Sequence, residues 1–192
     1  MAAISVYSPD QRQTLLEIAA ASIAYSLKHY KALPVQIVKY QLELQALRAT
    51  FVTLYLNEKF QGCIGALRAI RPLALDVARN AHSAAFEDPR GGAIREPDLK
   101  RLKIIISVLS EAEPMQFKNE ADVIAQLRPG VDGVIFEDGG RVGTLLPSVW
   151  ESLIDPRAFF EHTKLKAGLS AHYWSPTVIV KRYTTESFSN GA

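Results

Sequence analysis

The chain has 192 residues, and 48% of them are hydrophobic, so it can bury a sizeable core as one domain or two closely packed ones. Its 22 basic and 20 acidic side chains leave a formal charge of +2, which gives little support to nucleic-acid binding. A single cysteine excludes an internal disulfide, and the sequence shows neither a signal peptide at residues 1–5 nor a membrane-spanning stretch, so we expect a soluble cytoplasmic protein.

The first predicted element is a helix that begins with a capping box at Ser8-Pro9-Asp10-Gln11, with Ser8 as N-cap and proline at the first helical position. Apolar residues at helical spacing predict its buried face: Leu16, Ala20, Ile23 and Leu27. The helix should end near Tyr30. Residues 36–47 fit neither the helical nor the strand period and stay unassigned.

A β-hairpin is predicted next, from the alternating residues 49–56 and the segment 60–65. A three-residue loop at 57–59 sets Thr53 opposite Cys63 and apolar residues opposite one another, whereas a two-residue loop mixes the faces. Cys63 then lies on the more polar face. The glycines on either side of it, Gly62 and Gly65, predict a bulge or a close approach of another backbone or of a ligand.

The rest of the chain mixes helices and strands irregularly. Helices are predicted at 71–86, 119–127 and 155–168, strands at 102–109 and 177–183, a hairpin at 133–136 and 141–145, and a loose tail at 189–192. The second helix carries a small-residue face, and its polar side, with Asp76, Asn80 and Ser83, is expected to be solvated. The pattern favours an α+β fold with a largely antiparallel sheet flanked by helices over a doubly wound fold.

Cys63 is the candidate nucleophile, and such a thiol needs a base or a positive neighbour to react at neutral pH. The four histidines are scattered, so Arg68 is the most attractive cationic neighbour. A buried cysteine that only packs is the alternative. The sequence has no cysteine and histidine spacing typical of a metal site, so no metal is predicted. It also lacks a phosphate-binding loop, so no nucleotide cofactor is predicted. The basic cluster Lys100, Arg101 and Lys103 lacks aromatic interleaving and is a weak nucleic-acid signal.

Several motifs follow one another along the chain: Ala49-Thr50-Phe51-Val52-Thr53-Leu54, Gly62-Cys63-Ile64-Gly65, Arg71-Pro72-Leu73 with Asn80-Ala81, Phe86-Glu87-Asp88-Pro89-Arg90, Gly130-Val131-Asp132-Gly133-Val134, Leu145-Leu146-Pro147-Ser148-Val149-Trp150 and Lys166-Ala167-Gly168-Leu169. Taken in this order, they resemble the AMMECR family, which is named after a chromosomal region linked to Alport syndrome, midface hypoplasia and elliptocytosis. The resemblance covers most of the chain. Two positions depart from the family pattern: Gln61 replaces an arginine, and Gly91 replaces an aromatic residue.

The resemblance implies an α+β protein with a larger antiparallel-sheet domain, a smaller second lobe and a hydrophilic cleft near the cysteine motif. It implies no established reaction. Together with the residue chemistry above, it leaves Cys63 as the candidate catalytic residue and these candidate binding residues: Gly62, Gly65, Arg68, Asn80, Asp88 and Arg90. Prokaryotic members are associated with Memo-like and radical-SAM proteins, which suggests a shared modification pathway.

Three hypotheses follow. In the first, the protein is an accessory in that pathway and binds an unknown small ligand or a partner at the Cys63 face. In the second, it is a cysteine-dependent enzyme in which Cys63 attacks an electrophile, Arg68 stabilises negative charge, and His82 or His162 is the base. The third, nucleic-acid binding, rests on scattered basic residues alone.

Overall fold

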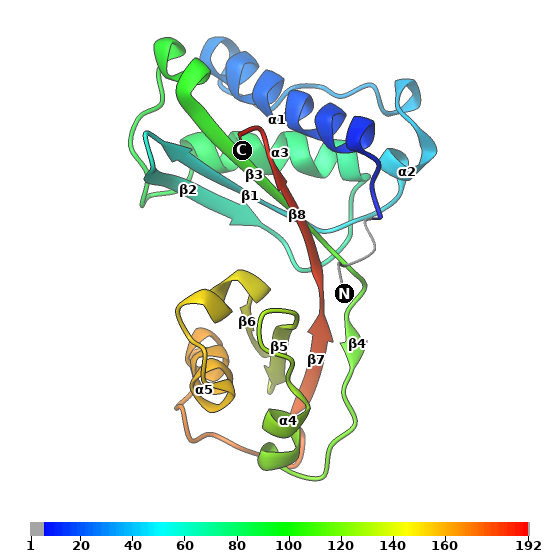
Figure 1. Ribbon diagram of the computed structural model, residues 1–192, viewed down its shortest axis with the longest axis vertical. Coiled ribbons are helices and arrows are strands. Elements are labelled where there is room, and N and C mark those ends of the chain that lie inside the picture. The colour runs from blue at the N-terminus through cyan, green and yellow to red at the C-terminus, as the bar shows by residue number, and fades with distance from the viewer. Residues whose placement is uncertain (1–5, 192) are drawn as a thin grey trace. The chain divides into compact units, whose positions relative to one another are not determined.

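The computed structural model of the chain describes residues 6–191, which divide into two compact units (Figure 1). Within the described residues, the first unit contains 6–109 and 186–191, and the second contains 110–185. Each unit has its own four-stranded sheet and hydrophobic core among these residues. The expectations for residues 1–5 and for Ala192 lie outside this range. Across residues 6–191, no helix combines the length and apolar character needed to cross a bilayer.

The sheet of the first unit has the strand order β2-β1-β3-β8 within the described residues. Its strands are β1 (Thr50–Leu56), β2 (Lys59–Gly65), β3 (Leu102–Leu109) and β8 (Thr185–Ser189). β3 is an interior strand, as its two apolar faces predict, and β1 pairs antiparallel with both β2 and β3. The loose tail predicted at 189–192 is wrong for its first residues, because Ser189 ends β8 and Asn190 hydrogen-bonds to the backbone of Ile104 and Leu102.

Two helices, α1 (Pro9–His29) and α3 (Leu73–Phe86), cover one face of this sheet (Figure 1). The capping box at Ser8 is present as predicted. Leu16 and Ile23 of α1 are buried, but Ala20 is exposed and Leu27 is only half-buried, so the predicted buried face was partly wrong. Most of the other buried positions precede the predicted ones by one residue: Leu15, Ala19, Ser22 and Ser26. Shorter elements are η1 (Ile37–Lys39), α2 (Leu42–Gln45) and η2 (Glu96–Arg101).

The polar side of α3 is buried, against the expectation that it would be solvated. Asp76 is 1% exposed and accepts hydrogen bonds from the backbone and hydroxyl of Thr50, from Asn80 and from Arg71. These bonds satisfy the carboxylate inside the protein, which removes the usual penalty for burying it. The network ties the start of β1 to the first turns of α3. It therefore fixes where the strand before the cysteine motif begins.

The hairpin of β1 and β2 has the predicted pairing at its centre and a different turn. Thr53 faces Cys63, as predicted. The loop has two residues, Asn57 and Glu58, both with positive φ, and not three. A β-bulge at Gln61 supplies the missing residue, because Leu54 pairs with Gly62 while the next residue pairs with Phe60. The tight turn and the bulge together restore the predicted register beyond the bulge, whereas next to the turn Leu56 pairs with Lys59 and not with an apolar residue.

The second unit contains a sheet with the strand order β4-β7-β5-β6 among the described residues. Its elements are β4 (Glu113–Pro114), α4 (Glu120–Gln126), β5 (Gly133–Asp138), β6 (Arg141–Leu145), η3 (Pro147–Glu151), α5 (Pro156–Lys166) and β7 (Ile179–Tyr183). The predicted hairpin and helices are confirmed here. The core combines aliphatic with aromatic side chains, and Trp150 stacks on Phe159 with ring centroids 3.8 Å apart. The α+β class with antiparallel pairing is confirmed.

Candidate functional site

The thiol of Cys63 lies on the face of the first sheet that α1 and α3 leave uncovered. Strand alternation places Val52, Leu54 and Ile104 in the core under the helices, so their neighbours in sequence point to the other face. We call this surface the Cys63 face. It is made of half-buried side chains together with the more exposed Phe60: Phe51, Thr53, Tyr55, Phe60, Cys63 and Ile105.

β2 is an edge strand, and Asp88 and Arg90 cover its free edge at Cys63. The Asp88 carboxylate accepts a hydrogen bond from the Cys63 backbone amide at 2.8 Å, and Nη2 of Arg90 donates to the Cys63 carbonyl oxygen at 3.0 Å. These are the two groups that a neighbouring strand would satisfy. The pair, which we call the edge clamp, therefore closes the sheet here and fixes the backbone on which the thiol is mounted.

Within the edge clamp, Asp88 and Arg90 are held by several hydrogen bonds. Arg90 donates to the carboxylate through Nε at 2.9 Å, Nη2 at 2.6 Å and its backbone amide at 3.0 Å. The Asp88 side chain is only 1% exposed and the Arg90 side chain is 61% exposed, so water is kept from the carboxylate but not from the guanidinium. They hold the pKa of Asp88 well below its ordinary value, Arg90 being the main cause and the Cys63 amide a further one.

The Arg90 guanidinium extends from the clamp onto the Cys63 face. It lies over the Phe60 ring, 5.1 Å from the centroid, and the Phe60 ring meets Tyr55 edge to face. Its pKa is raised chiefly by the hydrogen bonds to Asp88, with attraction to Cys63 as a smaller contribution. Nη1 makes no hydrogen bond within residues 6–191. One charged donor beside the thiol is therefore free for a ligand.

Two glycines, Gly62 of the predicted site and Gly91 outside it, are required by close backbone approaches. A Cβ at Gly62 would lie 2.0 Å from the carbonyl oxygen of Ala84 in α3, and one at Gly91 would lie 1.6 Å from that of Gln61. Gln61 also accepts a hydrogen bond from the Gly92 amide through Oε1 at 3.2 Å. The two departures from the family pattern, Gln61 and Gly91, are thus in direct contact, next to the edge clamp.

The immediate partner of the thiol is Thr53, whose hydroxyl donates to Sγ at 3.1 Å. Within the described residues, neither a histidine nor a carboxylate is hydrogen-bonded to Sγ. His82 lies instead between Ser26 and Glu87, and His162 contacts the carbonyl oxygen of Ala158 in the second unit. The two histidines considered as bases are therefore engaged elsewhere.

The remaining predicted binding residues have different surroundings. Arg68 is exposed in the segment after β2 and makes no hydrogen bond or ion pair with any described residue. Asn80 is 4% exposed, and its amide donates to Thr50 and Asp76 in the buried network. Gly65 pairs with Phe51 at the end of β2. The structure thus brings Gly62, Asp88 and Arg90 together around Cys63.

Sequence reasoning missed Thr53 and Phe60 as members of the site. The register argument already placed Thr53 opposite Cys63, which was a usable signal. Phe60 had no signal of its own, because its contact with Arg90 depends on the bulge and on the loop after α3. As for metals, residues 6–191 hold no group of three or more histidine, cysteine or acidic side chains arranged to bind one.

The second unit contains a further polar centre at Asp138, which the sequence did not reveal. Its carboxylate accepts hydrogen bonds of 2.7 Å from three hydroxyls, those of Tyr173, Ser175 and Thr177. These bonds lower its pKa to about 2, Tyr173 being the largest cause. The three donors all lie in the segment between α5 and β7. Asp138 therefore ties this segment to the end of β5.

Comparison with known proteins gives consistent matches. A sequence profile of the AMMECR1 family matches residues 16–188. A protein of Methanothermobacter thermautotrophicus is 34% identical over 183 residues, covering 94% of this chain and 95% of its own length. One of Saccharolobus solfataricus is 35% identical over 88% of this chain and 77% of its own. The crystal structure of the uncharacterized protein PH0010 from Pyrococcus horikoshii aligns with a TM-score of 0.81 at 30% identity, covering 91% of this chain and 89% of that one.

Proposed function

This chain belongs to the AMMECR1 family, and we propose that it is an accessory protein that binds a small ligand or a partner at the Cys63 face as part of a modification pathway. The observation that supports this is the set of contacts that surrounds the thiol of Cys63. Its backbone is fixed by the edge clamp, its sulfur accepts a bond from Thr53, and no described acid or base is hydrogen-bonded to it. A binding surface needs fixed donors and shape, and it needs no proton transfer.

The chemistry of the Cys63 face suits a flat ligand with a polar edge. Aromatic rings at Phe51, Tyr55 and Phe60 offer surfaces for stacking, and such contacts prefer planar partners. The free Nη1 of Arg90 offers a charged donor at the side of these rings. Its charge is partly balanced by Asp88, so this donor serves orientation more than attraction of a strongly charged group.

The family resemblance leads us to propose Memo-like and radical-SAM proteins as partners, and the single cysteine suits the reducing cytoplasm as the place of action. Pull-down with the tagged chain tests this. We expect a Memo-like or radical-SAM protein from the same cell to be retained by the wild type and by Cys63→Ala. Retention should weaken for Arg68→Ala and Arg90→Ala, because both remove exposed cations near the end of β2 or on the Cys63 face.

Lys31→Ala is the matched control, since Lys31 is exposed just after α1, on the side of the sheet away from Cys63. Equal retention by all variants would show that the Cys63 face is not the contact surface. Failure of the wild type to retain either protein would overturn the pathway proposal. Nucleic-acid binding is tested separately by filter retention of RNA and DNA at low and high salt, where we expect none that depends on salt.

A second candidate is a cysteine-dependent enzyme, favoured by the Thr53 hydroxyl and the Arg90 guanidinium next to the thiol. Both would stabilise negative charge on sulfur. This candidate predicts rapid alkylation of Cys63 by iodoacetamide near neutral pH. Thr53→Val should slow it by roughly fivefold, because a net hydrogen bond contributes about 1 kcal/mol. Slow alkylation that Thr53→Val leaves unchanged would remove the enzyme from consideration.

A further inference from the structure

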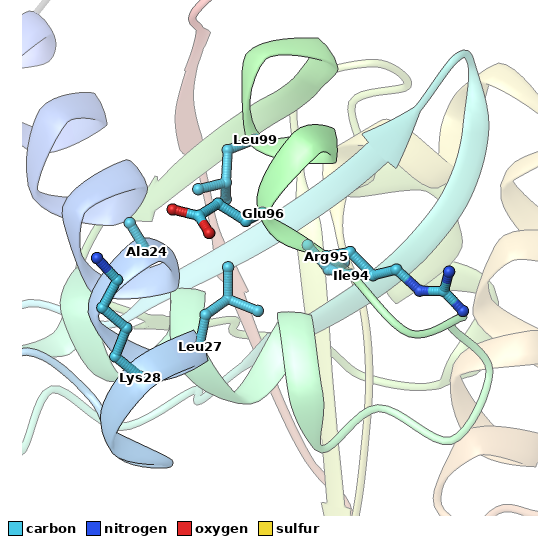
Figure 2. A pocket seen from close by; sticks show the side chains of 7 residues that line it. All are labelled: Ala24, Leu27, Lys28, Ile94, Arg95, Glu96 and Leu99. Atoms are coloured by element: carbon cyan, nitrogen blue, oxygen red, sulfur yellow. The ribbon is translucent and has the colours of Figure 1, made fainter.

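A pocket lies in the first unit between the end of α1 and the start of η2 (Figure 2). Its volume is about 350 Å³, which is within the range of small-molecule sites, about 300–1,000 Å³. The lining residues are Ala24, Leu27, Lys28, Ile94, Arg95, Glu96 and Leu99. All of them come from the helical side of the sheet, whereas Cys63 lies on the other face. The pocket is therefore separate from the Cys63 site.

The inner part of the pocket is apolar. Ile94 is buried and Leu99 packs against the hydrophobic core, so contacts with the core fix the positions of both side chains. Leu27 and Ala24 are on the side of α1 that is only half-buried, and Leu27 points into the pocket in Figure 2. Ala24 is the smallest of these side chains, and its size leaves the space open between the helix and η2. An apolar group of a ligand would gain by leaving water here.

The outer part of the pocket carries two opposite charges, each without a partner in the described part of the chain. Lys28 and Glu96 are exposed, and neither makes a hydrogen bond or an ion pair with any residue between 6 and 191. In Figure 2 the Lys28 ammonium and the Glu96 carboxylate both lie on the Ala24 side, while the Arg95 guanidinium points away. One cation and one anion thus border the same apolar space.

We infer that this pocket binds a free α-amino acid with a branched aliphatic or aromatic side chain. The ligand carboxylate would bind Lys28, its ammonium would bind Glu96, and its side chain would lie between Leu27 and Leu99. This occupant matches both charges and the apolar interior at once. A fatty acid would leave Glu96 facing a like charge, and a neutral apolar molecule would use neither charged group.

The test is isothermal titration of the full-length chain with L-leucine and L-phenylalanine. Saturable binding is expected with a Kd of about 1 mM or tighter. N-acetyl-L-leucine lacks the ammonium and L-leucinamide lacks the carboxylate, so each should bind about fivefold more weakly, the effect of an exposed ion pair worth up to about 1 kcal/mol. Glu96→Gln and Lys28→Gln should reproduce these two losses one by one, and Lys31→Gln should bind as the wild type does.

Ala24→Leu fills the pocket with a good helix former and should abolish binding while the circular dichroism spectrum stays unchanged. Three results would overturn the inference. One is the absence of saturable binding of either amino acid. Another is equal affinity for the blocked and the free amino acids, which would show an apolar site that ignores the charges. The third is undiminished binding by folded Ala24→Leu, which would place the ligand elsewhere.

Discussion

The edge clamp predicts a large and local effect of Asp88→Asn. The substitution keeps the shape of the side chain and removes its charge, so the bonds to the Cys63 amide and to Arg90 lose their ionic character. A hydrogen bond to a charged group contributes about 1.5–3 kcal/mol. The Arg90 side chain is 61% exposed and can be rehydrated, so we take the lower part of this range. The free energy of unfolding of the first unit should therefore fall by about 2 kcal/mol.

The assay must report on the first unit, and tryptophan fluorescence does not, because Trp150 and Trp174 both belong to the second. Hydrogen exchange of β2, read by mass spectrometry in increasing urea, follows the right element. For a slope of about 2 kcal/mol per M, a 2 kcal/mol loss lowers the urea midpoint by about 1 M. The Cys63 amide should exchange faster in Asp88→Asn, and the tryptophan transition should not move.

The neighbouring residue gives the control. Glu87 pairs with His82 at 3.4 Å from an exposed position, so Glu87→Gln should cost under about 1 kcal/mol.

The pH dependence follows from the lowered pKa of Asp88. Its charge stabilises the folded state above the ordinary value of 3.8, and this contribution is lost as the pH falls below 3.8 toward the folded pKa. The difference between wild type and Asp88→Asn should therefore shrink below pH 3.8. A midpoint for Asp88→Asn equal to that of Glu87→Gln would refute the clamp.

Two further predictions concern other parts of the chain. Gly91→Ala should increase exchange in β2, because its Cβ would lie 1.6 Å from the Gln61 carbonyl oxygen, whereas Gly92→Ala meets only the movable end of the Gln61 side chain at 3.3 Å and should be tolerated; equal effects would contradict this. Asp138→Asn should lower the urea midpoint of the second unit seen by tryptophan fluorescence. That loss should fade as the pH falls from 3.8 toward about 2, the folded pKa of Asp138, and a loss that persists at low pH would contradict the assignment.

Local sequence signals were sufficient for most elements of this protein. The Ser8 capping box and the proline at the first helical position fixed the start of α1, since both act within one turn. The two apolar faces of residues 102–109 identified an interior strand. Alternation also identified the Thr53 to Cys63 pairing, because this register sets apolar residues opposite one another, although the turn that produces it is shorter than predicted and is followed by a bulge.

Contacts between distant segments could not be read in this way. Asp88 was predicted as a binding residue from the family resemblance, yet its role at the edge of β2 depends on how α3 delivers the following loop to that strand. The buried polar side of α3 was missed because hydrogen-bond partners 26 to 30 residues away, at Thr50, satisfy Asp76 and Asn80. Burial of a polar group depends on such partners and not on its own helix.

By itself, the sequence determined the class of the fold, the family and the pairing of Thr53 with Cys63, because these follow from local period, capping and motif order. Only the tertiary structure decided which other residues meet around Cys63. Gln61 and Gly91 contact each other across a bulge, and Arg90 lies over Phe60 beside the thiol. These contacts join segments about 30 residues apart, and their geometry is set by packing of α3 on the sheet.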